Sequence, residues 1–208
     1  MGNDERAKIG GFIKPLSPYI KACRKMFATV FQSSQLKKAM PKLDHVMQKM
    51  IDVIESKREE GSIDFQKLSV QFTLDTIGVL AMETNLGGLD GSRQIHKRLI
   101  DAGHVARANA SRPFLPLYCK LFPNSRYARE QTKIFNDLID EWDALAKEIL
   151  KKEDPPEGEM PLWYALKTMI DPETNAPPKY DSFRGELAAG VIGGMVLSNV
   201  SGILKFGK

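Results

Sequence analysis

The stretch Phe183-Arg-Gly-Glu-Leu-Ala-Ala-Gly-Val-Ile-Gly-Gly-Met-Val-Leu-Ser198 decides the predicted fold. It carries charges only near its start, at Arg184 and Glu186, and is apolar on every side from Leu187 onward. A helix that is apolar all round lies in the middle of a large core or in a membrane. The stretch therefore predicts a central helix around which the other segments pack.

Three glycines interrupt this apolar helix, at Gly190, Gly193 and Gly194. Each glycine costs about 1 kcal/mol of helix stability relative to alanine. A cost of this size usually has a packing or functional reason, such as another group lying close to the backbone. Two explanations remain open: a buried core helix with small residues at a crossing, or a central helix whose glycines leave room for a flat cofactor or ligand.

The stretch Leu187–Leu204 is about long enough to span a bilayer. Glycines and the polar residues Ser198, Asn199 and Ser201 interrupt it, which predicts a buried helix rather than a membrane span. The N-terminus lacks the basic and then apolar pattern of a signal peptide. We therefore expect a location in the cytoplasm or on the cytoplasmic face of a membrane.

The composition is that of a globular protein. Of the 208 residues, 42% are hydrophobic and 27% are charged, which excludes wholesale disorder. The net charge is only +4, and no dense run of Lys and Arg or aromatic stacking motif indicates a nucleic-acid partner. Cys23 and Cys119 lie far apart and outside any CxxC pair, so a disulfide framework or structural zinc site is not expected.

The rest of the chain also shows helical periodicity. Almost no segment shows sustained strand alternation, so the sequence predicts an all-α fold. Ser17 followed by Pro18 is a good helix start. The expected helices before the final one are Tyr19–Phe31, Lys42–Arg58, one opening at Ser62–Asp64, Arg93–Ala106, Tyr127–Lys152 and Leu162–Ile170, and Asp181 or Ser182 is expected to cap the last helix.

Familiar catalytic patterns are missing from the sequence. The three histidines form no HExxH pair, and no phosphate-binding loop or nucleophile elbow is present. Asp75 and Asp101 are single carboxylates without an evident partner. The sequence therefore predicts no catalytic residue and no metal ligand in this chain.

Taken in order, three stretches resemble one family. They are Ile20–Phe31, then Ile63–Phe65 with Phe72–Gly78, and finally Glu186–Met195. These resemble, respectively, the C-helix, the E-helix and the start of the I-helix of the cytochrome P-450 haem-thiolate monooxygenases. The resemblance implies a mainly α, partial P-450-like fold that is truncated within the central I-helix. It divides the chain into a partial helical domain, residues 1–195, and a divergent tail, residues 196–208.

The resemblance also implies a cofactor, partners and residue roles. The parent type inserts an oxygen atom from O₂ into a small apolar organic substrate, using haem (heme) and electrons from a reductase, and the parent may not be excluded from a membrane. Arg24 matches the C-helix arginine that pairs with a haem propionate, a role that suits a guanidinium fork. Ile20 stands where the family has a propionate-bonding tryptophan, and the neighbouring Tyr19 is a partial substitute. Gly193 and Gly194 match the small residues that pass across the distal haem face.

The sequence departs from the family at two places that carry the chemistry. Val196, Leu197 and Ser198 stand where the family has an acid and a threonine for proton delivery to bound oxygen. The loop with the axial cysteine is absent, and neither Cys23 nor Cys119 has its glycine-rich context. We therefore expect a fragment that is inactive alone and, because half its core is missing, prone to aggregate. The alternative is a non-catalytic α-helical interaction or apolar-ligand-binding module, in which the final helix docks a partner.

Overall fold

The computed structural model describes residues 17–112 and 114–206, with side chains as far as Gly193 except that of Glu60. Within these ranges the chain is helical, and the only β feature is an isolated bridge between Asp171 and Ala176. The predicted all-α fold is confirmed. In chain order the elements are α1 (Pro18–Val30), α2 (Ser33–Ser56), the short 3₁₀ helix η3 (Arg58–Glu60), α3 (Phe65–Met82), α4 (Ile95–Ser111), α5 (Phe114–Leu121), α6 (Arg126–Leu150), α7 (Leu162–Thr168) and α8 (Tyr180–Phe206).

Two helix starts follow the capping chemistry of the sequence. The Ser17 hydroxyl accepts a 3.3 Å hydrogen bond from the Ile20 backbone N–H, and Pro18 occupies the first helical position of α1. Asp64 caps α3 in the same way, accepting from the Lys67 backbone N–H at 2.9 Å. Side-chain caps satisfy N–H groups that have no partner within the helix, and this fixes where each helix begins.

The prediction that the second helix starts at Lys42 is wrong. α2 begins at Ser33 and carries Pro41 in its interior, although an internal proline usually costs about 3 kcal/mol. Tertiary contacts hold the early turns in place: Gln35 Nε2 and Lys38 Nζ donate to the Gly158 carbonyl at 3.1 and 2.6 Å. Because Gly158 lies more than a hundred residues away, local sequence could not show these contacts.

The predicted cap of the last helix is also wrong. α8 begins at Tyr180, so Asp181 and Ser182 lie inside its first turn rather than in front of it. An acidic side chain there is favourable because the N-terminal end of a helix carries partial positive charge. A hydrogen bond from the Tyr180 hydroxyl to the Asp143 carboxylate anchors the first turn to α6.

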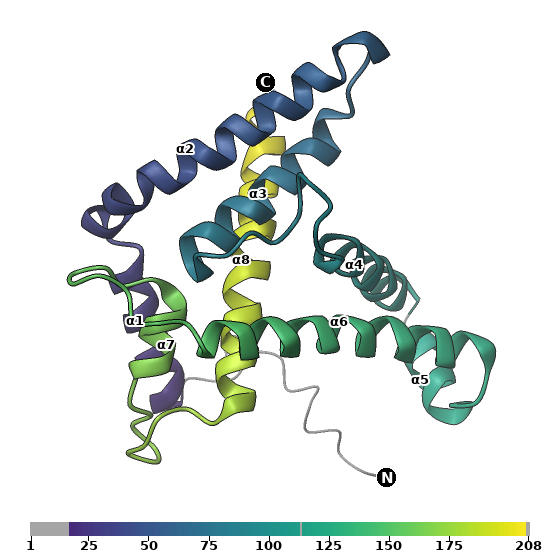
Figure 1. The fold of residues 1–208 in the computed structure, drawn as a ribbon. Helices are drawn as coiled ribbons and strands as arrows, with labels where there is room; N and C mark the ends of the chain where they lie inside the picture. Colours follow the sequence, from purple (N-terminus) through teal and green to yellow (C-terminus); the bar gives the residue numbers. More distant parts are fainter. Residues whose placement is uncertain (1–16, 113, 207–208) are drawn as a thin grey trace.

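Figure 1 shows α8 running through the middle of the molecule, with α6 crossing it and α3 lying beside its other half. α8 contacts α3, α6 and α7, while α2 packs on α3 and α1 packs on α7. The prediction that the last helix is central therefore holds. α5 lies at the far end of α6, on the opposite side of the view from α1 and α7 (Figure 1).

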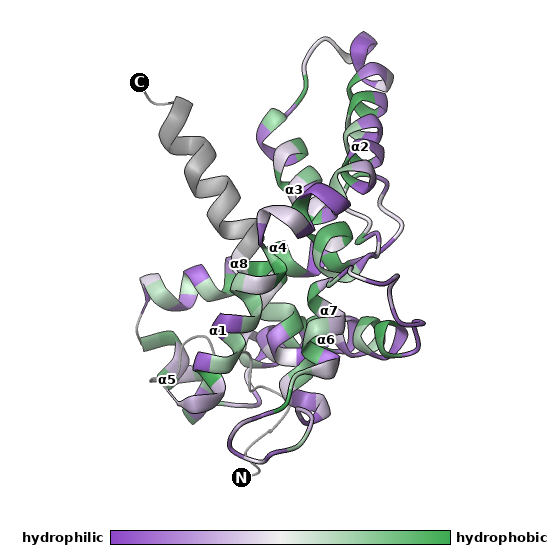
Figure 2. Ribbon diagram, turned by 90° about the vertical axis from the view of Figure 1, so that its left-hand side faces the viewer, coloured by the Kyte–Doolittle hydropathy of each residue, from purple (hydrophilic) through white to green (hydrophobic). Residues whose placement is uncertain are grey.

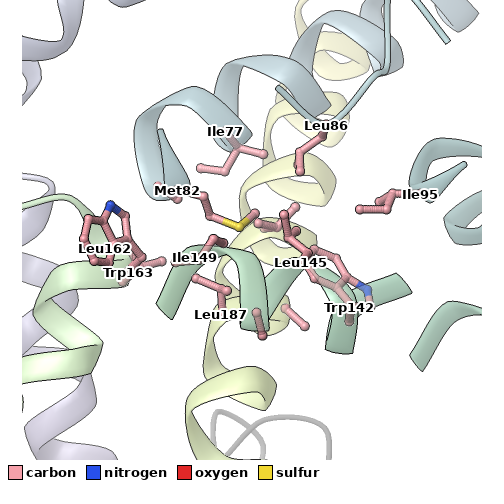
Figure 3. Close-up of a cluster of buried hydrophobic side chains, with 14 of the residues drawn as sticks. Ile77, Met82, Leu86, Ile95, Trp142, Leu145, Ile149, Leu162, Trp163 and Leu187 are labelled. Atoms are coloured by element: carbon pink, nitrogen blue, oxygen red, sulfur yellow. The ribbon is translucent and has the colours of Figure 1, made fainter. Parts of the chain in front are cut away.

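The core collects around the start of α8. Leu187 and Val191 are fully buried there, and Figure 3 shows Leu187 facing residues of α3, α6 and α7. Removing this apolar surface from water is the main favourable term of the fold. Among the described helices, none has the length and apolarity that a membrane span requires. The labelled core residues in Figure 3 are Ile77, Met82, Leu86, Ile95, Trp142, Leu145, Ile149, Leu162, Trp163 and Leu187.

Candidate functional site

Arg24 lies on the solvent side of α1. Its side chain is exposed, whereas Ile20 and Cys23 on the same helix are each 3% exposed. The helix therefore buries one face against the core and leaves the predicted propionate-binding guanidinium accessible. An arginine in that position is able to pair with a carboxylate without first losing another buried contact.

Tyr19 belongs to a different cluster, between α1 and α8. Its hydroxyl oxygen is buried, and burial is the main cause that raises its pKa, followed by the nearby Cys23 and Glu186. Five residues separate positions 19 and 24, which places them about 140° apart around the helix. The structure therefore does not bring Tyr19 beside Arg24, and the two do not form a joint propionate site.

The three glycines of α8 have different surroundings. A Cβ atom on Gly190 would lie 2.7 Å from Leu162 Cδ2 and 3.2 Å from Phe27 Cε1, so α8 passes closest to α7 and α1 at this point. A Cβ atom on Gly193 would meet nothing within 4 Å. The crossing explanation therefore accounts for Gly190, and the open space at Gly193 fits the cofactor explanation. Gly194 lies in α8, but its surroundings are outside the described side chains.

The two charged residues of α8 are buried, which the sequence did not predict. Arg184 is 8% exposed and its guanidinium lies 3.2 Å from Asp143 Oδ1 and 3.2 Å from Asp181 Oδ1. Asp143 also accepts from Lys147, and this contact is the largest cause that lowers its pKa. Glu186 is only 2% exposed. No signal in the sequence links Arg184 to Asp143, because the two lie 41 residues apart.

Asp75 also has partners, contrary to the prediction. This carboxylate is 2% exposed and accepts hydrogen bonds from the backbone N–H groups of Gly88 and Leu89, at 2.8 and 2.9 Å. Both donors belong to the main chain of the loop between α3 and α4. A search for side-chain partners could not find them, and the contact is structural rather than catalytic.

A polar network closes a small apolar cleft between the start of α2 and the end of α3. Glu83, in a left-handed conformation with φ of 50°, accepts from Lys42 Nζ and from Trp163 Nε1. Lys42 also lies 2.8 Å from Glu159 Oε2. The apolar lining of the cleft includes Val30, Leu36, Val79, Leu80 and Met160.

The comparisons with known proteins agree with this helical arrangement. The family model described as Cytochrome P450 matches residues 6–176. The chain belongs to the cytochrome P450 family. A solved structure, described as the crystal structure of a cytochrome P450 (CYP102L1), is similar with a TM-score of 0.63 at 12% sequence identity. That similarity covers 86% of this chain but only 40% of the other, so the chain spans less than half the length of that P450. No curated protein matches the sequence.

The P450 family match ends before α8 begins, at residue 176. The resemblance of Glu186–Met195 to an I-helix therefore lies outside the matched range. The backbone shows no break at the predicted boundary after residue 195, since α8 continues to Phe206. The division into residues 1–195 and 196–208 remains a prediction.

The described residues fit the edge and face of a haem better than its iron. A P450 haem needs a thiolate ligand, but burial raises the pKa of the Cys23 thiol to about 11, with Glu186 as a second cause. Cys119 lies on α5, with its sulfur 3.8 Å from Gln131 Oε1. Within the described part of the chain, no three His, Cys, Asp or Glu side chains converge as a metal site. Arg24 and Gly193 thus suit a propionate and a macrocycle face, while neither cysteine suits the axial position.

Proposed function

We propose that this chain is a fragment of a haem-dependent monooxygenase and that it is inactive on its own. The family match over residues 6–176 carries the proposal, because it covers most of the chain. The parent type inserts an oxygen atom from O₂ into a small apolar organic substrate and receives electrons from a reductase. The proposed location is the cytoplasm or the cytoplasmic face of a membrane, and no nucleic-acid partner is proposed.

Two positions are proposed to hold the haem. The exposed Arg24 guanidinium would pair with a propionate, a charge-assisted contact that a planar fork suits. Gly193, together with Gly194, would let the macrocycle approach the α8 backbone, and the open space beside Gly193 supports this role. When bound, the haem iron supplies the oxygen chemistry of the family.

The proposed inactivity rests on the residues that would hold and move protons and electrons. A buried thiol with a pKa of about 11 is protonated at neutral pH, so Cys23 would not supply a thiolate. Val196 and Leu197 stand where the resemblance expects an acid and a threonine, and neither side chain can carry a proton. Haem binding without monooxygenation is therefore the expected behaviour of this chain.

The second candidate function is an apolar-ligand-binding module. The cleft lined by Val30, Leu36, Val79, Leu80 and Met160 favours it, because small-molecule sites are mostly apolar with a few polar groups at the rim. An apolar fluorescent dye distinguishes the two functions. Dye binding that a Leu80→Gln change abolishes, in a chain that does not bind haem, would favour the second function.

Titration of the purified chain with haem tests the first function. We expect Arg24→Leu to weaken haem binding by about tenfold, since it removes a charge-assisted contact worth roughly 1.5 kcal/mol. Lys21→Leu is the matched control, because it removes the same charge from an exposed position one turn earlier on α1. Equal weakening by both variants would reduce the effect to overall charge, and absence of haem binding would contradict the proposal.

A second pair of variants tests the α8 face. Gly193→Leu should weaken haem binding because its side chain would occupy the space left open there. Gly103→Leu on α4 is the control, since a Cβ atom there also meets nothing within 4 Å. Haem binding that is unchanged by Gly193→Leu would remove this glycine from the proposed site.

A further inference from the structure

α5 turns its apolar side chains outward. None of its residues is buried, although the helix is strongly apolar in sequence. An ordinary surface helix does the opposite and places its apolar stripe against the core. The exposed fractions are 79% for Phe114, 53% for Leu117, 42% for Tyr118, 64% for Leu121 and 56% for Phe122, the residue directly after the helix.

Polar groups hold α5 to the rest of the molecule. The Cys119 thiol is half-buried and lies 3.8 Å from the amide oxygen of Gln131 on α6. Gln131 in turn exchanges two hydrogen bonds with Asn109 on α4, at 3.3 and 3.2 Å. The inward contact of α5 is therefore polar and its outward surface is apolar, so the exposed side chains do not result from a helix that has come loose.

The chain around α5 is uniformly basic. Between Asp101 and Glu130 the sequence contains no acidic residue at all. The basic residues of this stretch are exposed, and among them only Arg126 forms a printed ion pair within the described residues, with Glu130 at 2.8 Å. They are Arg107, Arg112, Lys120, Arg126 and Arg129.

The position of α5 makes this surface accessible as a unit. In Figure 1, α5 projects beyond the far end of α6, and in Figure 2 it lies at the lower left of the view, away from the core. We define the α5 surface as Phe114, Leu117, Tyr118, Leu121 and Phe122 with the five basic residues named above. It is apolar at its centre and positively charged around it.

We propose that the α5 surface docks onto an anionic lipid membrane. Aromatic and leucine side chains beside Lys and Arg are the composition of segments that lie in the plane of a membrane interface. Basic residues near such a surface add attraction to anionic lipids. With eight residues, α5 is about 12 Å long, against roughly 30 Å of hydrocarbon, so the geometry is that of docking and not of spanning.

The charge pattern separates this surface from the other exposed apolar residues. Met47 and Ile51 on α2 are 51% and 41% exposed, but acidic residues lie beside them at Asp44 and Asp52. An anionic membrane would be repelled there. The α2 residues therefore provide a control of similar exposure and opposite charge setting, and the proposal depends on neither haem nor the proposed monooxygenase ancestry.

Vesicle flotation of the full chain, without haem, tests the charge requirement. We expect binding to vesicles of phosphatidylcholine with phosphatidylserine, and weaker binding by about tenfold to phosphatidylcholine alone. A double change, Arg112→Gln with Lys120→Gln, should reduce binding to the anionic vesicles by about tenfold. Equal binding to both vesicle types, or no binding to either, would overturn the proposal.

A fluorescent reporter tests the apolar contact directly. Both native tryptophans are buried, with Trp142 4% and Trp163 1% exposed, so a tryptophan added at Phe114 reports on the α5 surface. We expect Phe114→Trp emission to shift to the blue and to be quenched by brominated lipids in anionic vesicles. Phe65→Trp on α3, a site 56% exposed, should show neither effect.

Loss of vesicle binding in a Phe114→Ser, Leu121→Ser variant, with Met47→Ser, Ile51→Ser unaffected, completes the expected pattern. Circular dichroism and urea unfolding of each variant separate docking from folding. If another polypeptide covers the α5 surface instead, the Phe114→Trp reporter will change on self-association but not on addition of vesicles. That outcome would also overturn the proposal.

Discussion

The Tyr180 hydroxyl, in the first turn of α8, donates a 2.8 Å hydrogen bond to Asp143 Oδ1 on α6. The same carboxylate oxygen lies 3.2 Å from Arg184 Nη1. One acidic side chain on α6 therefore fixes the start of the central helix through two partners. This contact positions α8 before the glycine-bearing part of the helix begins.

Changing Tyr180 to phenylalanine tests this anchor. We expect the free energy of unfolding to fall by about 1 kcal/mol, the usual net value of a hydrogen bond, because the ring remains and only the hydroxyl is lost. Urea denaturation measures the change. Tyr118→Phe on the exposed α5 is the control and should leave the free energy unchanged.

Gly190→Ala should destabilise the fold although alanine favours helices. Its Cβ would lie 2.7 Å from Leu162 Cδ2, and Leu162 is fully buried and has no free space to move into. Overpacking of this kind costs about 1–3 kcal/mol, which exceeds the gain of about 1 kcal/mol in helix propensity. Gly103→Ala on α4, where a Cβ meets nothing within 4 Å, should instead be neutral or stabilising in the same urea measurement.

Asp75→Ala should cost about 3 kcal/mol, because it leaves the Gly88 and Leu89 N–H groups without their charged acceptor. Amide hydrogen exchange of the loop between α3 and α4 should accelerate with it. Asp101→Ala, at a half-buried carboxylate on α4, is the comparison and should change the stability by less than about 0.5 kcal/mol. Similar losses in both variants would contradict a specific role for Asp75.

His96 should make the stability depend on pH. Burial lowers the pKa of His96 below 6.5, Lys67 adds to this effect and Asp75 opposes it, while Nε2 is buried with no hydrogen-bond partner in the described part of the chain. Below that pH the unfolded chain binds a proton that the folded chain resists, so the free energy of unfolding falls as the solution becomes more acidic.

Replacing His96 by glutamine should remove that part of the pH dependence, measured by urea unfolding between about pH 7 and about pH 5. His104→Gln, at an exposed position of the same helix, should keep the pH dependence of the original chain. An unchanged slope in the His96 variant would assign the pH dependence to other groups.

The sequence predicted those features that depend on local chemistry. The caps Ser17 and Asp64, the apolar stripe of α6 and the central place of α8 all follow from side chains within one or two helical turns. The features that it missed depend on distant partners. Pro41 lies inside α2 because Gln35 and its neighbours bind a loop near Gly158, far along the chain.

The candidate site divides in the same way. The glycines of α8 were found from the sequence because they interrupt an apolar helix, and the structure gives Gly190 and Gly193 different surroundings. The burial of Arg184 and Glu186 could not be predicted, since their neighbours come from α1 and α6. The role of Arg24 came from the resemblance alone and remains a prediction.

The central claim is that this P450-family chain holds haem without a thiolate on the iron. The direct measurement is the reduced carbon-monoxide difference spectrum of the purified 208-residue chain after incubation with haem. We predict a haem spectrum without the thiolate-type band, and no change in a variant with Cys23→Ser and Cys119→Ser. A thiolate-type band that disappears in that variant would contradict the account.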